Sequence, residues 1–173
     1  MKNFKSFETE RLYIRPTNEE DALFLLGLMN TPKWLQFIGD RNIKTLDHAS
    51  MYIKNKIIPQ LHRLGYSNYT IIRKGDNTKL GTCGLYDRNG LEGIDIGFAL
   101  LPEHEGNGYA LEATYRLQQA AFEEFGLNHL SAITAKDNTA SQGLLVKLKF
   151  KLTGTVVLPE DTETLLLFTN QLG

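Results

Sequence analysis

The chain has 173 residues, enough for one domain with its own hydrophobic core, and we predict a single domain over residues 1–173. A net charge of −1 argues against the strongly basic surface of a nucleic-acid-binding protein. The single cysteine, Cys83, excludes an intrachain disulfide and a cysteine-rich metal site, and we expect no metal. No apolar run approaches the ~20 residues of a membrane span, and the first residues lack a signal-peptide pattern, so we expect no membrane partner and a cytoplasmic protein.

The first strand and helix are predicted from alternation and from capping residues. Residues 11–15 alternate charged and apolar side chains, which is typical of a half-buried strand. A helix is expected over residues 17–30, because Thr17 and Glu20 fit a capping box and apolar residues recur on one helical face. The acids of its first turn are expected to cap the helix and to face solvent.

The next segment, residues 31–39, is short and aromatic. Trp34 and Phe37 have two possible roles: they wall a substrate pocket, or they pack one helix onto the next, which is the more common use of such residues. A second helix is expected over residues 45–63, with Pro59 kinking it or ending its regular part.

A hairpin is predicted near the middle of the chain. Residues 68–73 and 79–86 are rich in strand-forming side chains and are separated by the turn-forming residues 74–77. The two strands should therefore pair antiparallel. Cys83 lies within the second strand, where nothing nearby supplies a base or lowers its pKa, so it is expected to be a small buried hydrophobe.

The second half alternates strands and helices, and its elements are expected at residues 94–101 (strand), 108–125 (helix), 129–135 (strand), 138–148 (helix), 150–157 (strand) and 163–168 (strand). Asn138 is a favourable N-cap for the second of these helices. Together these elements predict an α+β fold with a mixed, mostly antiparallel sheet of about six to seven strands, flanked by about four helices.

The turn between the strand at 94–101 and its following helix is a candidate anion site. Gly106 and Gly108 permit positive φ and leave their N–H groups uncovered, and the helix directs its free N–H groups at the same turn. Such a turn binds phosphate or pyrophosphate readily. Leu111 stands where a dinucleotide fingerprint needs a third glycine, and no Gly-Lys-Ser/Thr follows, so neither a dinucleotide nor a nucleotide triphosphate is expected.

Three segments together resemble the GNAT N-acetyltransferase superfamily: residues 95–98 (Asp-Ile-Gly-Phe), 105–113 (Glu-Gly-Asn-Gly-Tyr-Ala-Leu-Glu-Ala) and 138–141 (Asn-Thr-Ala-Ser). The opening segment 8–16 (Glu-Thr-Glu-Arg-Leu-Tyr-Ile-Arg-Pro) resembles the branch that contains the ribosomal-protein N-terminal acetyltransferases. The resemblance implies acetyl-CoA as the acetyl donor. It implies that the cofactor contacts Phe98, Ala99, Leu100, Leu101, Glu105, Gly106, Asn107, Gly108, Tyr109, Ala110, Asn138 and Ser141.

This sequence departs from the family pattern at three positions. Glu105 stands where the phosphate loop usually has Gln or Arg; we expect its carboxylate to face solvent and CoA affinity to survive. Leu145 replaces the tyrosine that many members use to protonate the CoA thiolate, and the resemblance suggests that Ser141 assists the leaving group instead. Lys149 stands where a glycine usually ends the helix, so a lysine is expected in a left-handed cap.

The acceptor amine must lose a proton, and Asp95 and Glu92, on or just before the cleft strand, are the candidate bases; the alternative is that both are solvated acids. The acceptor is expected to be a protein N-terminus or a small-molecule amine. A closed pocket lined by Trp34, Phe37 and Tyr86 would favour a small amine. A second class of function is a CoA-binding sensor or interaction module without turnover. We expect a monomer or a homodimer.

Overall fold

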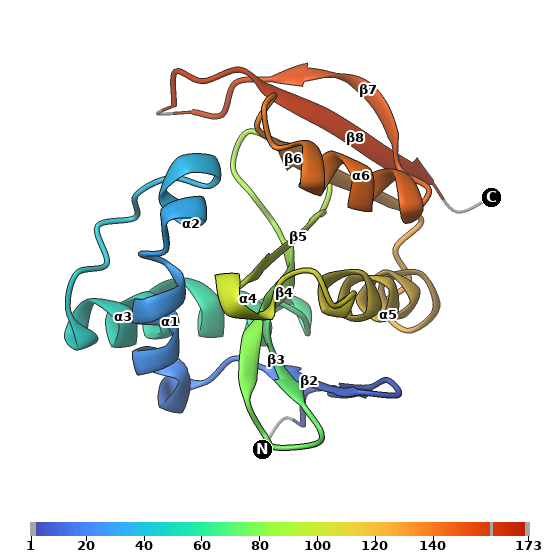
Figure 1. Cartoon of the computed structure of the whole chain (residues 1–173). Coiled ribbons are helices and arrows are strands. Elements are labelled where there is room, and N and C mark those ends of the chain that lie inside the picture. The colour runs from blue at the N-terminus through green and yellow to red at the C-terminus, as the bar shows by residue number, and fades with distance from the viewer. Residues whose placement is uncertain (1–2, 160, 172–173) are drawn as a thin grey trace.

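The computed structural model describes residues 3–159 and 161–171, and within them one sheet of eight strands forms the centre of the molecule (Figure 1). The strand order is β1-β2-β3-β4-β5-β6-β8-β7, and all neighbours are antiparallel except β5 and β6. The strands are β1 (Phe7–Glu8), β2 (Leu12–Pro16), β3 (Asn68–Arg73), β4 (Lys79–Tyr86), β5 (Asp95–Leu100), β6 (His129–Thr134), β7 (Lys151–Val156) and β8 (Leu165–Gln171). The helical segments are η1 (Glu19–Asp21), α1 (Ala22–Leu28), α2 (Pro32–Phe37), α3 (Leu46–Tyr52), η2 (Ile53–Ile57), α4 (Ile58–Leu64), η3 (Pro102–His104), α5 (Tyr109–Glu123) and α6 (Thr139–Lys147).

The predicted α+β class and mixed sheet are confirmed, with one or two strands more than expected. The additional strand, β1, has only two residues and pairs Phe7 with Ile14 of β2, which is too short a segment for any alternation to mark it. The helices within the described residues also exceed the predicted four. The aromatic segment forms α2, where Thr31 accepts a hydrogen bond from the Trp34 N–H as an N-cap.

The predicted helix over residues 45–63 is present, but a π-helical turn replaces a kink. Thr45 caps α3, and the chain continues through the π-helical segment η2 into α4. Pro59 lies directly after this wider turn, and it has no amide hydrogen to complete the ordinary helical ladder. Gly65 ends α4 in the left-handed region with φ of +88°.

The start of the first helix differs from the prediction. Asn18, not Thr17, is the N-cap: its side chain accepts from the Glu20 N–H, while the Asp21 carboxylate accepts from the Asn18 N–H at 3.0 Å. The expected capping box of Thr17 and Glu20 is therefore wrong. Thr17 is buried instead, because its side chain turns toward the sheet and its hydroxyl lies 2.9 Å from that of Thr70 on β3.

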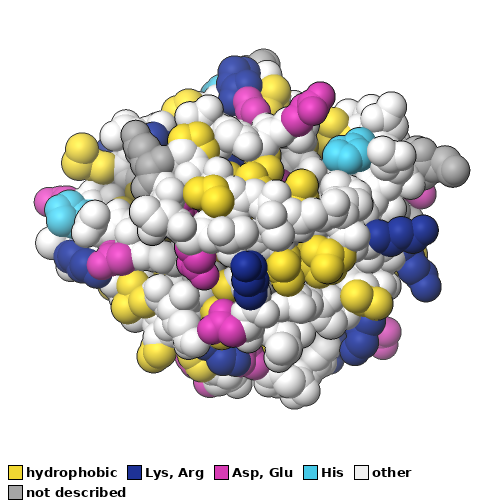
Figure 2. All heavy atoms as spheres, turned by 90° about the horizontal axis from the view of Figure 1, so that it is seen from above, with side chains coloured by type: hydrophobic (Ala, Val, Ile, Leu, Met, Phe, Trp, Pro, Cys, Tyr) yellow, Lys and Arg dark blue, Asp and Glu magenta, His cyan; other side chains and the backbone are white. Residues whose placement is uncertain are grey.

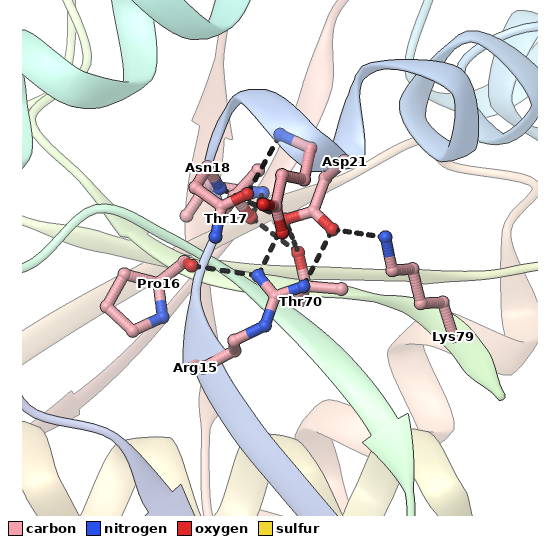
Figure 3. A network of polar contacts seen from close by, with 9 residues as sticks. Arg15, Pro16, Thr17, Asn18, Asp21, Thr70 and Lys79 are labelled. Atoms are coloured by element: carbon pink, nitrogen blue, oxygen red, sulfur yellow. Dashed lines mark hydrogen bonds and ion pairs between the residues drawn. The ribbon is translucent and has the colours of Figure 1, made fainter. Parts of the chain in front are cut away.

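Asp21 is also not the solvated acid that was expected. Its side chain is fully buried and accepts hydrogen bonds from both Nη atoms of Arg15, at 2.7 and 2.9 Å, and from the Thr70 hydroxyl at 3.0 Å (Figure 3). Lys79 Nζ lies 2.7 Å from the same carboxylate. Burial alone would raise the pKa of Asp21, but the hydrogen bonds from Arg15 and Lys79 outweigh it and lower the pKa well below its ordinary value. The carboxylate thus joins the start of α1 to β2, β3 and β4.

Two hydrophobic clusters pack against the sheet, and β5 contributes to both. Phe98 and Leu100 pack with the cluster built around α5, whereas Ala99 and Leu101 pack with the cluster of α1, α3 and η2. Alternate side chains of β5 therefore face opposite sides of the sheet. Cys83 is fully buried in β4, where burial raises the pKa of its thiol, as expected for a small hydrophobe.

The surface carries charges of both signs. In Figure 2, acidic and basic side chains are interspersed on the face seen from above and do not gather into a patch of one sign. Within residues 3–159 and 161–171, no helix is long and apolar enough to cross a bilayer. In the same residues, no group of three or more His, Cys, Asp or Glu side chains is arranged to hold a metal ion.

Candidate functional site

The parallel strands β5 and β6 pair at only one position and then separate. Asp95 is in register with Ser131, and the Ser131 N–H donates to the Ile94 carbonyl at 3.0 Å. By contrast, β4 pairs with the whole length of β5. Beyond its first residues, β5 therefore has one edge to which no strand of the described residues pairs, between β4 and the β6–β8 part of the sheet (Figure 1).

Hydrogen-bond alternation determines which N–H groups of β5 face this open edge. The Leu101 N–H donates to the Leu80 carbonyl at 2.9 Å, continuing the β4–β5 register. Antiparallel ladders alternate, so the Ala99 N–H also faces β4, whereas the N–H groups of Phe98 and Leu100 face the open edge. The Leu101 N–H is therefore used within the sheet, and of these four residues only Phe98 and Leu100 present their N–H groups at the open edge.

The chain passes from β5 through η3 into the glycine turn. Gly106 and Gly108 both have φ of +81°, a backbone angle that residues other than glycine rarely adopt, and both are exposed. Gly108 is the N-cap of α5 and supplies no side-chain cap, so the first-turn N–H groups, including those of Tyr109 and Ala110, have no acceptor within the helix. The Asn107 side chain donates to the Glu105 carbonyl at 3.2 Å and closes the turn.

The start of α6 supports the capping role predicted for Asn138. Its Oδ1 accepts from the Ser141 N–H at 3.3 Å, which leaves its Nδ2 without a hydrogen-bond partner among the described residues. Ser141 is half-buried in the first turn of the helix. Leu145, one helical turn further, is 1% exposed and belongs to the core, so no acid is present at that position. Lys149 has φ of +71°, which confirms the left-handed cap.

The two candidate bases lie in different environments. Asp95 is 1% exposed, and its two carboxylate oxygens accept from Arg88 Nε at 3.1 Å and Arg88 Nη2 at 3.2 Å. Burial raises the pKa of Asp95 above its ordinary value, and the Arg88 guanidinium offsets this only in part. Glu92 is exposed in the loop before β5. The partner Arg88 was not predicted, because residues 87–90 carry only the pattern of a turn.

A comparison with known families matches residues 11–151 to the acetyltransferase (GNAT) domain. This chain belongs to the GNAT acetyltransferase family. Among curated relatives, p20 of Bacillus licheniformis, an uncharacterized N-acetyltransferase, is 31% identical over 150 residues, covering 84% of this chain and 82% of that protein. YoaA of Bacillus subtilis (strain 168), also an uncharacterized N-acetyltransferase, is 26% identical over 154 residues, covering 88% and 86%.

A solved structure shows the same fold. RimL, the ribosomal L7/L12 alpha-N-protein acetyltransferase, in complex with coenzyme A, superposes with a TM-score of 0.81 at 18% identity, covering 97% of this chain and 98% of that one. This acetyltransferase therefore shares its overall fold with RimL.

The acid at position 105 of this acetyltransferase has a cationic partner. Lys33 Nζ, on α2, lies 2.5 Å from a Glu105 carboxylate oxygen, and the Glu105 side chain is 33% exposed. The carboxylate therefore lies against Lys33 at the rim of the turn, and its charge is paired across 72 residues of sequence. No local pattern indicates this partner.

Tyr86 lies beside Asp95 in the β4–β5 register and on the same face of the sheet. Its ring covers two glycines: a methyl group on Gly84 would overlap the ring, and one on Gly97 would lie 3.1 Å from it. The Arg88 guanidinium is 5.4 Å from the ring centroid. Tyr86, Arg88 and Asp95 thus form one cluster next to the open edge.

A chain of hydrogen bonds anchors the Tyr86 ring. Its hydroxyl donates to Asn68 Oδ1 at 2.5 Å, and Asn68 Nδ2 donates to the Thr17 hydroxyl at 2.8 Å. Thr17 in turn bonds Thr70, which donates to Asp21. Because the Asp21 carboxylate only accepts, every donor in the chain is directed toward it. The phenol proton therefore points away from the open edge, and burial raises the pKa of Tyr86.

The aromatic residues of α2 are both half-buried. Trp34 packs with the cluster of α1, α3 and η2, to which Ala99 and Leu101 also belong. Its indole Nε1 is buried and has no hydrogen-bond partner in the part of the chain that the structure describes. The packing role considered for Trp34 agrees with this position, while a role of Trp34 and Phe37 in binding an acceptor stays a prediction.

Proposed function

We propose that this protein transfers the acetyl group of acetyl-CoA to a primary amine by direct attack. The observation that carries the proposal is the continuity of two features: the open edge of β5 leads directly into the glycine turn at the start of α5. An extended arm with amide groups fits an unpaired strand edge, and a pyrophosphate fits uncovered N–H groups at a helix N-terminus. CoA carries both of these groups, the arm with amide groups and the pyrophosphate.

The chain's own groups suit this reaction. Acetyl-CoA supplies an activated thioester when bound. The N–H groups of Phe98 and Leu100 face the open edge, where they can stabilise a developing oxyanion. Asn138 Nδ2 is available to the pantetheine arm. In this proposal Asp95 removes the amine proton, directly or through water, and the Ser141 hydroxyl hydrogen-bonds the departing sulfur. Holding the two reactants together supplies much of the rate.

Replacing Ser141 by alanine is expected to lower kcat about tenfold, because one hydrogen bond to the leaving sulfur is lost. The CoA dissociation constant should stay within about threefold of the wild-type value, because the Asn138 side chain still accepts from the backbone N–H of residue 141. Thiol release measures kcat and calorimetry measures binding. Thr139→Ala, an exposed change in the same helical turn, is the matched control. Full turnover by Ser141→Ala would refute the role of the hydroxyl.

Replacing Glu105 by glutamine is expected to change the CoA dissociation constant by less than about threefold, since Lys33 already offsets the carboxylate and both side chains are partly exposed. Calorimetric titration of both proteins with CoA measures this. A wild-type dissociation constant in the millimolar range, restored to tight binding by Glu105→Gln, would show that the acid opposes the pyrophosphate.

The acceptor class is the finer part of the proposal. The likeness to RimL, which is named for a ribosomal protein, supports a protein N-terminus over a small-molecule amine. Thiol release from acetyl-CoA with a panel of peptides and small amines tests this, and release with peptides alone is expected. Many family members have a proton-donating tyrosine at the position that Leu145 occupies in the core here. The absence of that side chain favours the second candidate, a CoA-binding protein without turnover. Tight CoA binding with no release for any amine would favour that candidate.

A further inference from the structure

The cationic side chain of Arg11, a residue near the start of the sequence, lies beside the glycine turn. Arg11, just before β2, donates from Nε to Glu112 Oε1 at 2.7 Å and from its backbone N–H to Glu112 Oε2 at 3.1 Å. Its guanidinium carbon lies 4.4 Å from the centroid of the Tyr109 ring. Glu112 and Tyr109 both belong to the first turn of α5, so this helix start fixes the guanidinium on two sides.

The remaining edge of the Arg11 guanidinium is free. None of the hydrogen bonds among the described residues uses its Nη atoms, and the side chain is 42% exposed. A β-carbon added to Gly108 would lie 3.5 Å from Arg11 Nη2. The free N–H groups therefore border the turn on the side that Gly108 leaves without a side chain.

The other cationic side chains near the glycine turn are already engaged with carboxylates. Arg73 lies 6.0 Å from the Tyr109 ring, but its guanidinium is occupied by Asp76 through Nε at 3.0 Å and Nη2 at 2.7 Å. Within the turn itself, position 105 is an acid, and Lys33 is engaged with it. Arg11 thus brings an oriented cation with an open edge to a turn whose own sequence supplies an anion.

We propose that Arg11 binds the pyrophosphate of CoA and replaces, from the start of β2, the polar or cationic side chain that Glu105 does not supply. Guanidinium binds phosphate oxygens through paired, charge-assisted hydrogen bonds, and these add to the N–H groups of the helix start. Glu112 and Tyr109 are positioning residues that hold the guanidinium. This inference rests on the proposed function, because it requires CoA as the ligand.

Calorimetric titration with CoA and with 3′-dephospho-CoA tests the assignment. Arg11→Gln is expected to raise both dissociation constants by about tenfold or more and by the same factor, since both ligands carry the pyrophosphate. The dependence of affinity on salt should become shallower. Arg116→Gln is the matched control: Arg116 also lies against a ring, 4.7 Å from the Phe7 centroid, and pairs with Glu124 at 2.9 Å, and its loss is expected to change affinity less than twofold.

A second measurement uses the unaltered protein, in case Arg11→Gln fails to fold. CoA is expected to slow phenylglyoxal modification of Arg11 at least tenfold and to leave that of Arg116 unchanged, as followed by peptide mass spectrometry. Equal modification rates with and without CoA would overturn the inference, as would an affinity loss confined to the ligand with the 3′-phosphate. CoA binding that is indifferent to Arg11 would leave the proposed function intact, whereas no CoA binding by the wild type would overturn both.

Discussion

Replacing Asp21 by asparagine is expected to lower the free energy of unfolding by about 3–5 kcal/mol, the usual effect of removing one partner from a buried ion pair. The change leaves the Arg15 guanidinium and the Lys79 ammonium, which converge on the buried carboxylate, without their counter-charge. The amide nitrogen of asparagine cannot accept a hydrogen bond in either orientation. At the Oδ1 position it would face the donors Arg15 Nη2 and Lys79 Nζ, and at the Oδ2 position it would face the Thr70 hydroxyl and the Asn18 N–H. Urea unfolding at neutral pH measures the loss.

The pH dependence of stability distinguishes this network from a surface pair. The folded-state pKa of Asp21 lies below its unfolded value, so its contribution is present above about pH 4 and is lost as the pH falls toward the folded pKa. Asp21→Asn should therefore show a weaker decline of stability in acid than the wild type. Asp76→Asn, which breaks the exposed pair with Arg73, is the control and should change stability by less than about 1 kcal/mol. Equal losses for the two variants would contradict the role assigned to burial.

The sequence patterns located most elements because strand and helix signals are local. They failed where a side chain's orientation depends on distant residues. Thr17 and Asn18 are both good caps, and only the position of β3 turns Thr17 inward. An acid at a helix start carries the same pattern whether it faces water or, as Asp21 does, a buried arginine and lysine. β1 was missed because two residues show no periodicity.

The same difference between local and distant residues applies to the candidate site. The glycine turn and the start of α5 were predicted, because one short segment contains every residue of that pattern. The side chains that complete the charge pattern around the site come from elsewhere: Lys33 from α2, Arg88 from the loop after β4, and Arg11 from the chain before β2. Sequence spacing carries no signal for such contacts, since they depend on how the sheet and helices pack.

Replacing Asp95 by asparagine is expected to reduce kcat/KM about 100-fold, the usual size of a general base contribution. Asp95 lies at the last paired position of β5 and β6, where the open edge begins, and on the face of the sheet that carries Tyr86. Its raised pKa places the acidic limb of the kcat/KM profile above the pH at which an ordinary aspartate titrates. Because asparagine does not titrate in this range, Asp95→Asn should flatten that limb.

The same variant also weakens the pair with Arg88, so activity alone does not separate a base from a structural anchor. Arg88→Gln provides the separation: it removes the same pairing but keeps the carboxylate, and it is expected to lower stability while retaining a titrating limb, shifted to higher pH because the neighbouring cation is gone. Glu92→Gln, at the exposed candidate, should leave kcat/KM within about twofold. An unchanged acidic limb in Asp95→Asn would contradict the assignment of Asp95 as the general base. Loss of the acidic limb in Glu92→Gln would contradict it as well.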